Sequence, residues 1–210
     1  DSLPRKLELL EAHRVQAVVV QPFSAAYART PPEAFEAALF DGLGARTVIV
    51  GYDFAYGLKR AGTVERLHLA AASRGAQVKR VSPVSVEGVV VSSSKIREFV
   101  LEGRVEAAHC LLGRPFDLDG LVVKGSQRGR ALGFPTANVD TPNELRPATG
   151  VYAVKVRILG APDALWYGGA ANIGVKPTFD GAEATIEAHL LDFEGDLYGK
   201  RLRVQFLERL

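Results

Sequence analysis

The hydrophobic pattern changes its period once along this chain, and that change limits the folds available to it. Up to about residue 112, short apolar runs alternate with helical patterns, whereas beyond Gly113 apolar residues tend to recur at every second position. The two periods require different structures, because successive side chains of a strand point to opposite faces. The sequence therefore predicts two domains, residues 1–112 and 113–210, that meet at Gly113, Arg114 and Pro115.

The first domain is predicted to be α/β, with a parallel sheet. Continuous apolar runs bounded by polar residues are typical of strands buried on both faces of such a sheet. Strands are expected at 15–20, 46–50 and 76–81. Helices are expected at 34–43 behind a capping box from Thr30 to Glu33, from a Thr63 cap to Gly75, and at 95–102 and 105–112 with Gly103 and Gly113 as their stops.

The second domain is predicted to be a small antiparallel barrel. In residues 151–159, Val154, Val156 and Ile158 share one face of a strand. Closing the sheet removes the exposed edges that so many short strands would otherwise leave. Five or six strands are expected, at about 116–124, 134–139, 150–159, 165–173, 184–192 and 201–210.

A candidate metal and nucleotide clamp lies in the stretch Gly133 to Asn138, behind the loop Gly125 to Gly133. Pro135 fixes its own φ and pushes Phe134 into an extended conformation, so a strand should leave the loop here. Thr136 and Asn138 would then offer two neutral oxygens on one face, which suits Mg²⁺ whose remaining ligands are nucleotide phosphates. The alternative is a turn and a strand with Thr136 and Asn138 as ordinary surface residues.

Glu187 is the candidate catalytic group. In the strand 184–192, Ile186, Ala188 and Leu190 occupy one face, which leaves Glu187 and His189 on the other. Such a carboxylate is either a solvated residue of the outer face or a general base that accepts the proton of an alcohol during phosphoryl transfer. For His189 we expect a structural, hydrogen-bonded role.

The first domain offers two further candidate positions. Ser93, Ser94 and Arg97 lie at a helix start, where unpaired N–H groups favour anions, although a serine-rich N-cap explains the serines equally well. Gly51, Asp53 and Phe54 follow a predicted parallel strand, where open α/β sheets bind ligands.

Composition excludes several classes of function. A net charge of +2 without a basic block gives no reason to expect nucleic acid or a membrane surface, and no apolar run approaches a membrane span. The single Cys110 cannot form an intramolecular disulfide, which fits a cytoplasmic protein, and no Cys or His cluster has zinc spacing. Because the chain begins at Asp1 and contains no Met, we expect a preceding segment.

Seven motifs in register resemble those of the bacterial bifunctional riboflavin kinase and FAD synthetase family. They are GYDFAYGLKRAG at 51–62, VSSSKIR at 91–97, LLGRPF at 111–116, GFPTANV at 133–139, GVYAVKV at 150–156, ANIGVKPTF at 171–179 and IEAHLLDFEGDLYGKRLRV at 186–204. The resemblance implies a Rossmann-type, nucleotidyltransferase-like domain that adenylylates FMN to FAD. It also implies a six-stranded Greek-key-like barrel that phosphorylates riboflavin to FMN with ATP and Mg²⁺.

The resemblance also assigns roles to residues. Glu187 would be the catalytic base, and Thr136 and Asn138 would hold Mg²⁺. Gly125, Gly133, Phe134, Pro135, Thr136 and Asn138 would bind ATP in the kinase domain, and Gly51, Asp53, Phe54, Ser93, Ser94 and Arg97 would line the adenylyltransferase pocket.

Two elements of that family are expected outside the sequence given: a first strand and turn with a phosphate-binding histidine pair before Asp1, and a helix after Leu210. A flavin or nucleotide binding module without turnover is the rival hypothesis. A barrel that binds single-stranded nucleic acid is disfavoured, because basic and aromatic residues do not interleave on any one strand. Oligomeric state, metal preference and the survival of adenylyltransferase activity are not predictable from the sequence.

Overall fold

The structure is a computed structural model that describes residues 2–125, 135–160, 165–178 and 181–210. These residues form two compact units. One unit is made of Asp1–Val15 together with Val91–Leu210, and the other of Gln16–Val90. No helix in the described part of the chain is both long and apolar enough to cross a membrane.

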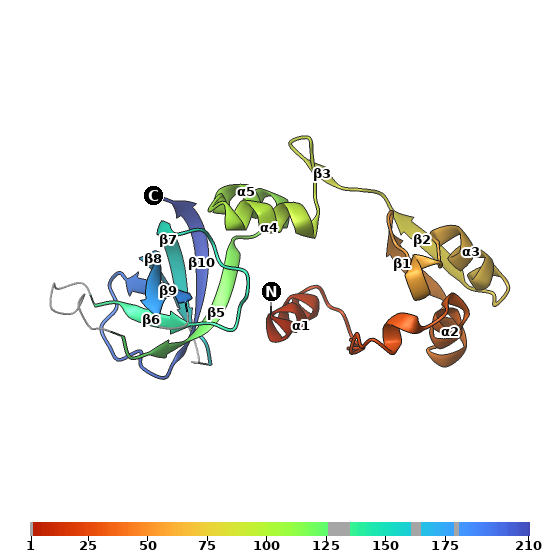
Figure 1. The fold of residues 1–210 in the computed structure, drawn as a ribbon, viewed down its shortest axis with the longest axis horizontal. Helices are drawn as coiled ribbons and strands as arrows, with labels where there is room; N and C mark the ends of the chain where they lie inside the picture. The colour runs from red at the N-terminus through yellow and green to blue at the C-terminus, as the bar shows by residue number, and fades with distance from the viewer. Residues whose placement is uncertain (1, 126–134, 161–164, 179–180) are drawn as a thin grey trace. The chain divides into compact units, whose positions relative to one another are not determined.

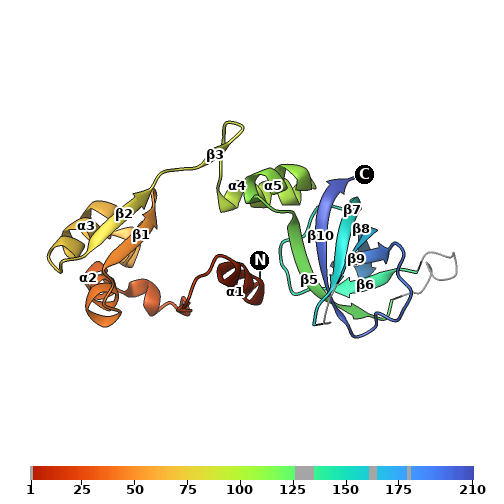
Figure 2. The same ribbon diagram turned by 180° about the vertical axis from the view of Figure 1, so that it is seen from behind.

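The Gln16–Val90 unit is a small α/β layer in which two parallel strands are joined through a helix (Figures 1 and 2). Its elements are α2 (Pro32–Ala37) with a π-helical turn at Ala38–Gly42, β1 (Thr47–Gly51), α3 (Val64–Ala72), β2 (Gln77–Val81), the hairpin β3 (Ser85–Val86) and β4 (Val89–Val90), and 3₁₀ turns at Tyr27–Arg29 and Leu58–Arg60. The buried core of this unit consists of Phe40, Val50, Tyr56, Val64, Leu67, Ala71 and Val78.

Two of the three predicted parallel strands are confirmed, and the third is wrong. β1 and β2 pair along their whole length, from Thr47 opposite Gln77 to Gly51 opposite Val81. Residues 15–20 adopt no regular structure, and Val19 is 74% exposed. An apolar run becomes a strand only where neighbouring strands satisfy its N–H and C=O groups, and none of the described residues pairs with this run.

The helix caps of this unit were predicted with mixed success. Thr63 caps α3 as expected, because its hydroxyl accepts a hydrogen bond from the backbone N–H of Arg66 at 3.2 Å. The predicted capping box is wrong: Pro31 occupies the N-cap position of α2 and provides no side-chain cap. The carboxylate of Glu33 instead pairs with Arg66 at 2.7 Å.

Glu36 of α2 carries a buried negative charge that pairs with Arg66 of α3. It is 6% exposed and accepts hydrogen bonds from the Tyr56 hydroxyl at 2.7 Å and from Nε of Arg66 at 2.6 Å. Burial alone would raise the pKa of Glu36, but the hydrogen bonds from Arg66 and Tyr56 outweigh it and hold this pKa below the ordinary value of 4.5. The charged form of Glu36 therefore stabilises the folded unit.

We expect Glu36→Gln to destabilise this unit by about 1–3 kcal/mol at pH 7, because a charge-assisted hydrogen-bond network is lost. A carboxylate whose pKa is lower in the folded state contributes fully above its unfolded-state value and loses that contribution as the pH falls through the folded-state value. The difference between parent and variant should therefore shrink below about pH 4. Urea unfolding followed by circular dichroism checks this, and fluorescence of Trp166, the one tryptophan of the chain, should not shift because Trp166 lies in the other unit.

The second unit contains a closed six-stranded antiparallel barrel, as predicted. Its strands are β5 (Phe116–Val123), β6 (Ala137–Asp140), β7 (Gly150–Ile158), β8 (Trp166–Thr178), β9 (Gly181–Leu190) and β10 (Arg201–Arg209). Around the barrel they follow the order β10, β5, β6, β9, β8, β7 and back to β10, so neighbours in sequence are not always neighbours in space. Alternate side chains fill the interior, among them Tyr152, Val154, Val156, Ile173, Ile186, Ala188, Leu202, Val204 and Phe206.

Three helices belong to the same unit as the barrel: α1 (Leu3–Ala12), α4 (Ser93–Leu101) and α5 (Val105–Leu112). The predicted glycine stops of the last two are confirmed, with φ values of 79° at Gly103 and 68° at Gly113, where a residue with a side chain would be strained. α5 packs against β5 and β10. α1 was not predicted from the sequence.

α1 is attached to the outside of the barrel by charged residues. Asp117 of β5 is 0% exposed and accepts a hydrogen bond from Nε of Arg5 at 2.9 Å. Glu8 accepts hydrogen bonds from Arg5 at 3.0 Å and from Arg203 of β10 at 2.7 Å. Arg203 also donates to the nearly buried Asp119 through Nε at 2.7 Å. The side chains form a continuous ladder of alternating charge, which we call the α1 ion ladder.

Candidate functional site

Asn138 of the predicted clamp and Glu187 lie on adjacent strands of the barrel, β6 and β9, whereas Thr136 directly precedes β6 rather than lying in the strand predicted at 134–139. In the antiparallel register of β6 and β9, Asn138 is directly opposite Glu187, and Ala137 is opposite Ala188. Directly opposed residues have Cβ atoms about 5 Å apart and side chains on the same face. Asn138 and Glu187 are half-buried, whereas Ala137 and Ala188 are buried in the interior. The two polar side chains are therefore outer-face neighbours.

A third polar residue completes this row. β8 places Asn172 directly opposite Glu187 on the other side of β9, so the carboxylate stands between two amide side chains. Asn172 is exposed, which leaves the row open on that side. Amide groups both donate and accept hydrogen bonds, so they can hold a carboxylate in place without changing its charge.

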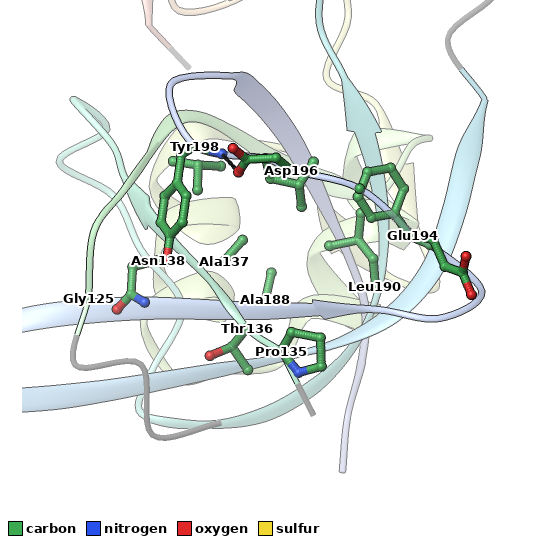
Figure 3. Close-up of a pocket in the computed structure, with 14 residues that line it drawn as sticks. Gly125, Pro135, Thr136, Ala137, Asn138, Ala188, Leu190, Glu194, Asp196 and Tyr198 are labelled. Atoms are coloured by element: carbon green, nitrogen blue, oxygen red, sulfur yellow. Dashed lines mark hydrogen bonds between the residues drawn. The ribbon is translucent and has the colours of Figure 1, made fainter. Parts of the chain in front are cut away.

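A cavity of about 700 Å³ opens beside β6 (Figure 3). This volume lies within the usual range for small-molecule sites. Thr136 and Asn138 belong to its wall, and Glu187 is not among the described residues that line it. The lining residues are Val122, Gly125, Pro135, Thr136, Ala137, Asn138, Ala188, Leu190 and the segment from Phe193 to Tyr198. Polar clamp residues and apolar interior residues thus meet at one cavity.

Gly125 is held close to the clamp. A Cβ atom at position 125 would overlap the side-chain amide of Asn138, so only glycine fits there without a shift. Gly125 also belongs to the cavity wall. This close approach gives a physical reason for glycine at the start of the loop. The other two predicted residues of the loop, Gly133 and Phe134, lie outside the described residues.

His189 contacts the beginning of the clamp. Its Nδ1 atom lies 2.9 Å from the carbonyl oxygen of Pro135. A carbonyl oxygen only accepts, so Nδ1 carries the proton and donates it. The structural, hydrogen-bonded role expected for His189 is consistent with this contact.

The segment from Phe193 to Tyr198 was missed as part of the site. This segment lies in the connection from β9 to β10 and forms part of the cavity wall. In Figure 3 the Tyr198 side chain extends toward Asn138. Asp196 accepts a hydrogen bond from the backbone N–H of Tyr198 at 2.9 Å and so closes the turn. Phe193 packs edge-on against Tyr167 of β8, with ring centroids 5.1 Å apart. Two aromatic and two acidic residues within six positions were the signal that could have indicated it.

The candidate metal ligands of this site, Thr136 and Asn138, carry no charge. In the described residues there is no group of three or more His, Cys, Asp or Glu side chains that could hold a metal ion by themselves. Thr136 and Asn138 present a hydroxyl and an amide oxygen in the cavity wall. Such a donor set fits Mg²⁺ that arrives with a nucleotide, because the phosphates would supply the negative charge.

Gly51, Asp53 and Phe54 lie together at the end of β1 in the Gln16–Val90 unit. Gly51 and Asp53 are exposed, and a Cβ at Gly51 would lie 3.3 Å from the Asp53 carboxylate. Phe54 instead packs in an aromatic cluster, stacked on Tyr56 with ring centroids 5.6 Å apart. Packing accounts for Phe54, whereas Gly51 and Asp53 are open to solvent.

Ser93, Ser94 and Arg97 lie in the first turns of α4, in the unit that contains the barrel. All three are exposed. The helix is capped by Ser92, whose hydroxyl accepts from the backbone N–H of Lys95 at 3.2 Å. Because Ser92 provides the cap, the hydroxyls of Ser93 and Ser94 are not needed for it.

The fold is that of a two-module protein in which a parallel α/β unit accompanies a closed antiparallel barrel with a ligand-sized cavity. Comparison with protein families identifies both parts: residues 1–95 match the FAD synthetase model and residues 112–210 the riboflavin kinase model. The chain belongs to the bacterial bifunctional riboflavin kinase/FAD synthetase family, which confirms the resemblance of its motifs.

Similar proteins span nearly the whole chain. The bifunctional riboflavin kinase/FMN adenylyltransferase of Pseudomonas fluorescens is 43% identical over 82% of this chain, and that of Haemophilus influenzae is 34% identical over 98%. The chain spans 54% and 66% of the lengths of these two relatives. A crystal structure from Streptococcus pneumoniae, titled a macrolide-efflux protein, superposes with a TM-score of 0.90 at 33% identity and covers all of this chain and 66% of that one.

Proposed function

We propose that the barrel transfers the γ-phosphate of ATP to the ribityl 5′ hydroxyl of riboflavin and so makes FMN. We propose further that the whole protein joins AMP from ATP to FMN and makes FAD. The substrates ATP, riboflavin and FMN are those of the family to which the chain belongs. The observation that carries the kinase proposal is the register that sets Asn138 opposite Glu187 beside the cavity.

In the proposed reaction the 5′ oxygen attacks the γ-phosphorus, the bond from that phosphorus to the bridging oxygen breaks, and ADP leaves. Glu187 would accept the proton of the attacking hydroxyl, and the flanking Asn138 and Asn172 would orient its carboxylate. Thr136 and Asn138 would bind Mg²⁺ through neutral oxygens. The ion would offset the charge that develops on the phosphates.

Chromatography of the chain incubated with riboflavin, ATP and Mg²⁺ tests the kinase proposal. Equal amounts of FMN and ADP are expected, and neither should form when riboflavin is omitted. Quenching of riboflavin fluorescence without FMN or ADP would contradict the proposal and favour a binding module without turnover. Replacing Mg²⁺ by Mn²⁺ or Zn²⁺ in the same assay measures the metal preference.

For the adenylyltransferase step we propose that Ser93, Ser94 and Arg97 contact phosphates and that Gly51, Asp53 and Phe54 line the nucleotide or flavin pocket. The assignment is supported by exposure to solvent, which is found for Ser93, Ser94, Arg97, Gly51 and Asp53. We also propose a module boundary near Gly113, where the riboflavin kinase match begins at residue 112, and a cytoplasmic location, which the single cysteine favours.

Gly125→Ala should lower kcat/KM for MgATP by about 10- to 100-fold, because its Cβ would displace Asn138 and a small misplacement at a reacting centre is costly. Gly168→Ala is the matched control, since a Cβ there would make only an ordinary contact with Leu191 at 3.9 Å. Initial rates at varied MgATP measure both variants. Equal loss in the two would indicate a general effect on the barrel and contradict the role of Gly125.

A further inference from the structure

The described backbone ladder of β6 begins at Ala137 on the side of β9 and at Asn138 on the side of β5. Among the described residues, β6 pairs with β9 through two positions only, Ala137 opposite Ala188 and Asn138 opposite Glu187. Continued by one residue, that register would set Thr136 opposite His189. Thr136 is preceded by Pro135, which has no N–H group to donate to a ladder. The clamp residue Thr136 therefore lies just beyond the end of the paired strand.

His189 provides a side-chain bond at this end. Its ring projects from the outer face of β9, the same face as Glu187, because the two residues are two positions apart on one strand. Nδ1 of His189 then reaches the carbonyl of Pro135 at 2.9 Å. One imidazole thus connects the strand that carries Glu187 to the residue immediately before Thr136.

We propose that His189 is a positioning residue of the kinase site: its Nδ1–H bond to Pro135 fixes Thr136 for the metal nucleotide. His189 does not itself touch the reacting atoms in this role. The inference deepens the proposed kinase function and rests on it. It predicts a selective effect on the nucleotide, because Pro135 and Thr136 belong to the proposed ATP clamp.

Two substitutions separate the donor from the bulk of the ring. His189→Leu introduces an apolar side chain of similar size and removes the N–H donor. In His189→Asn the amide can place an N–H group near the position of Nδ1. His68→Leu, at an exposed position of α3 in the other unit, controls for loss of an imidazole. FMN formation is measured at varied MgATP with saturating riboflavin and at varied riboflavin with saturating MgATP.

We expect His189→Leu to raise KM for MgATP about 3- to 10-fold, the value of one ordinary hydrogen bond, with KM for riboflavin and the unfolding midpoint near those of the parent. His189→Asn should stay within about twofold of the parent. Equal effects of Leu and Asn would overturn the proposal, and so would a parallel rise of both KM values with a lowered midpoint, which indicates a purely structural role.

Hydrogen exchange of the peptide 135–140 provides a readout that does not require turnover. His189→Leu should accelerate exchange there and His189→Asn should not, because the bond to Pro135 holds the start of β6. If the parent forms no FMN, the proposed kinase function fails, and this pattern alone decides whether His189 positions the clamp. Unchanged exchange in His189→Leu would overturn the positioning role even in an active kinase.

Discussion

Glu187→Gln is expected to lower kcat for FMN formation by about 10²- to 10⁴-fold while riboflavin still binds, because a general base contributes that much to proton transfer. Glutamine keeps the size and hydrogen-bonding capacity of the side chain but cannot take up the proton of the 5′ hydroxyl at neutral pH. Its position between Asn138 and Asn172 should hold the new amide where the carboxylate was.

Single-turnover rates at saturating MgATP measure the chemical step, and quenching of riboflavin fluorescence measures binding. Glu208→Gln, at an exposed position on β10 of the same barrel, is the matched control and should leave the rate unchanged. Full turnover in Glu187→Gln would remove Glu187 from the mechanism. A rate loss of equal size in Glu208→Gln would show that loss of any barrel carboxylate suffices.

The barrel was predictable from the sequence because its signal is local. Each strand carries its own alternation. In β7 the alternation puts Val154, Val156 and Ile158 on the inner face, and in the structure Val154 and Val156 are buried and Ile158 is half-buried. The glycines that end α4 and α5 are equally local, since a positive φ at one residue ends a helix. Strand faces and helix ends therefore followed from short stretches of sequence.

The contacts between distant segments did not follow. Alternation put Thr136 and Asn138 on one face and Glu187 on the outer face of its own strand, but the register that brings Asn138 opposite Glu187 depends on the closed barrel. The run 15–20 failed as a strand for the same reason, because strand formation depends on partners elsewhere in the chain. The segment from Phe193 to Tyr198 lines the cavity, and the cavity is formed by strands far apart in the sequence, so local patterns could not indicate its place in the site.

α1 is the clearest case of a feature hidden from local reasoning. None of its apolar residues is buried, so an amphipathic apolar face does not explain where it docks. Its charged partners are remote: Arg5 and Asp117 are 112 positions apart, and Glu8 and Arg203 are 195 apart. Charged residues on a helix usually indicate a solvent-exposed face, and here they mark an attachment.

Asp117→Ala is accordingly expected to destabilise the barrel unit by about 3–5 kcal/mol, because removal of one partner leaves buried opposite charge uncompensated. Arg5 is half-buried, with 13% of its side chain exposed, and Arg114 lies 3.4 Å from the same carboxylate. Burial lowers the pKa of Arg114, which reflects the cost of holding that guanidinium away from water. Without Asp117, two arginines would share a poorly solvated site with Glu8 as the remaining acid near Arg5.

Urea unfolding followed by Trp166 fluorescence reports this unit, since Trp166 begins β8. Glu98→Ala breaks a more exposed pair, with Lys95 in the same unit, where the glutamate side chain is 49% exposed, and should cost only about 0–1 kcal/mol. Hydrogen exchange in residues 3–12 should also rise in Asp117→Ala, because α1 loses its link to β5. A stability change as small as that of Glu98→Ala, with exchange in α1 unaltered, would mean that the α1 ion ladder does not hold this helix to the barrel.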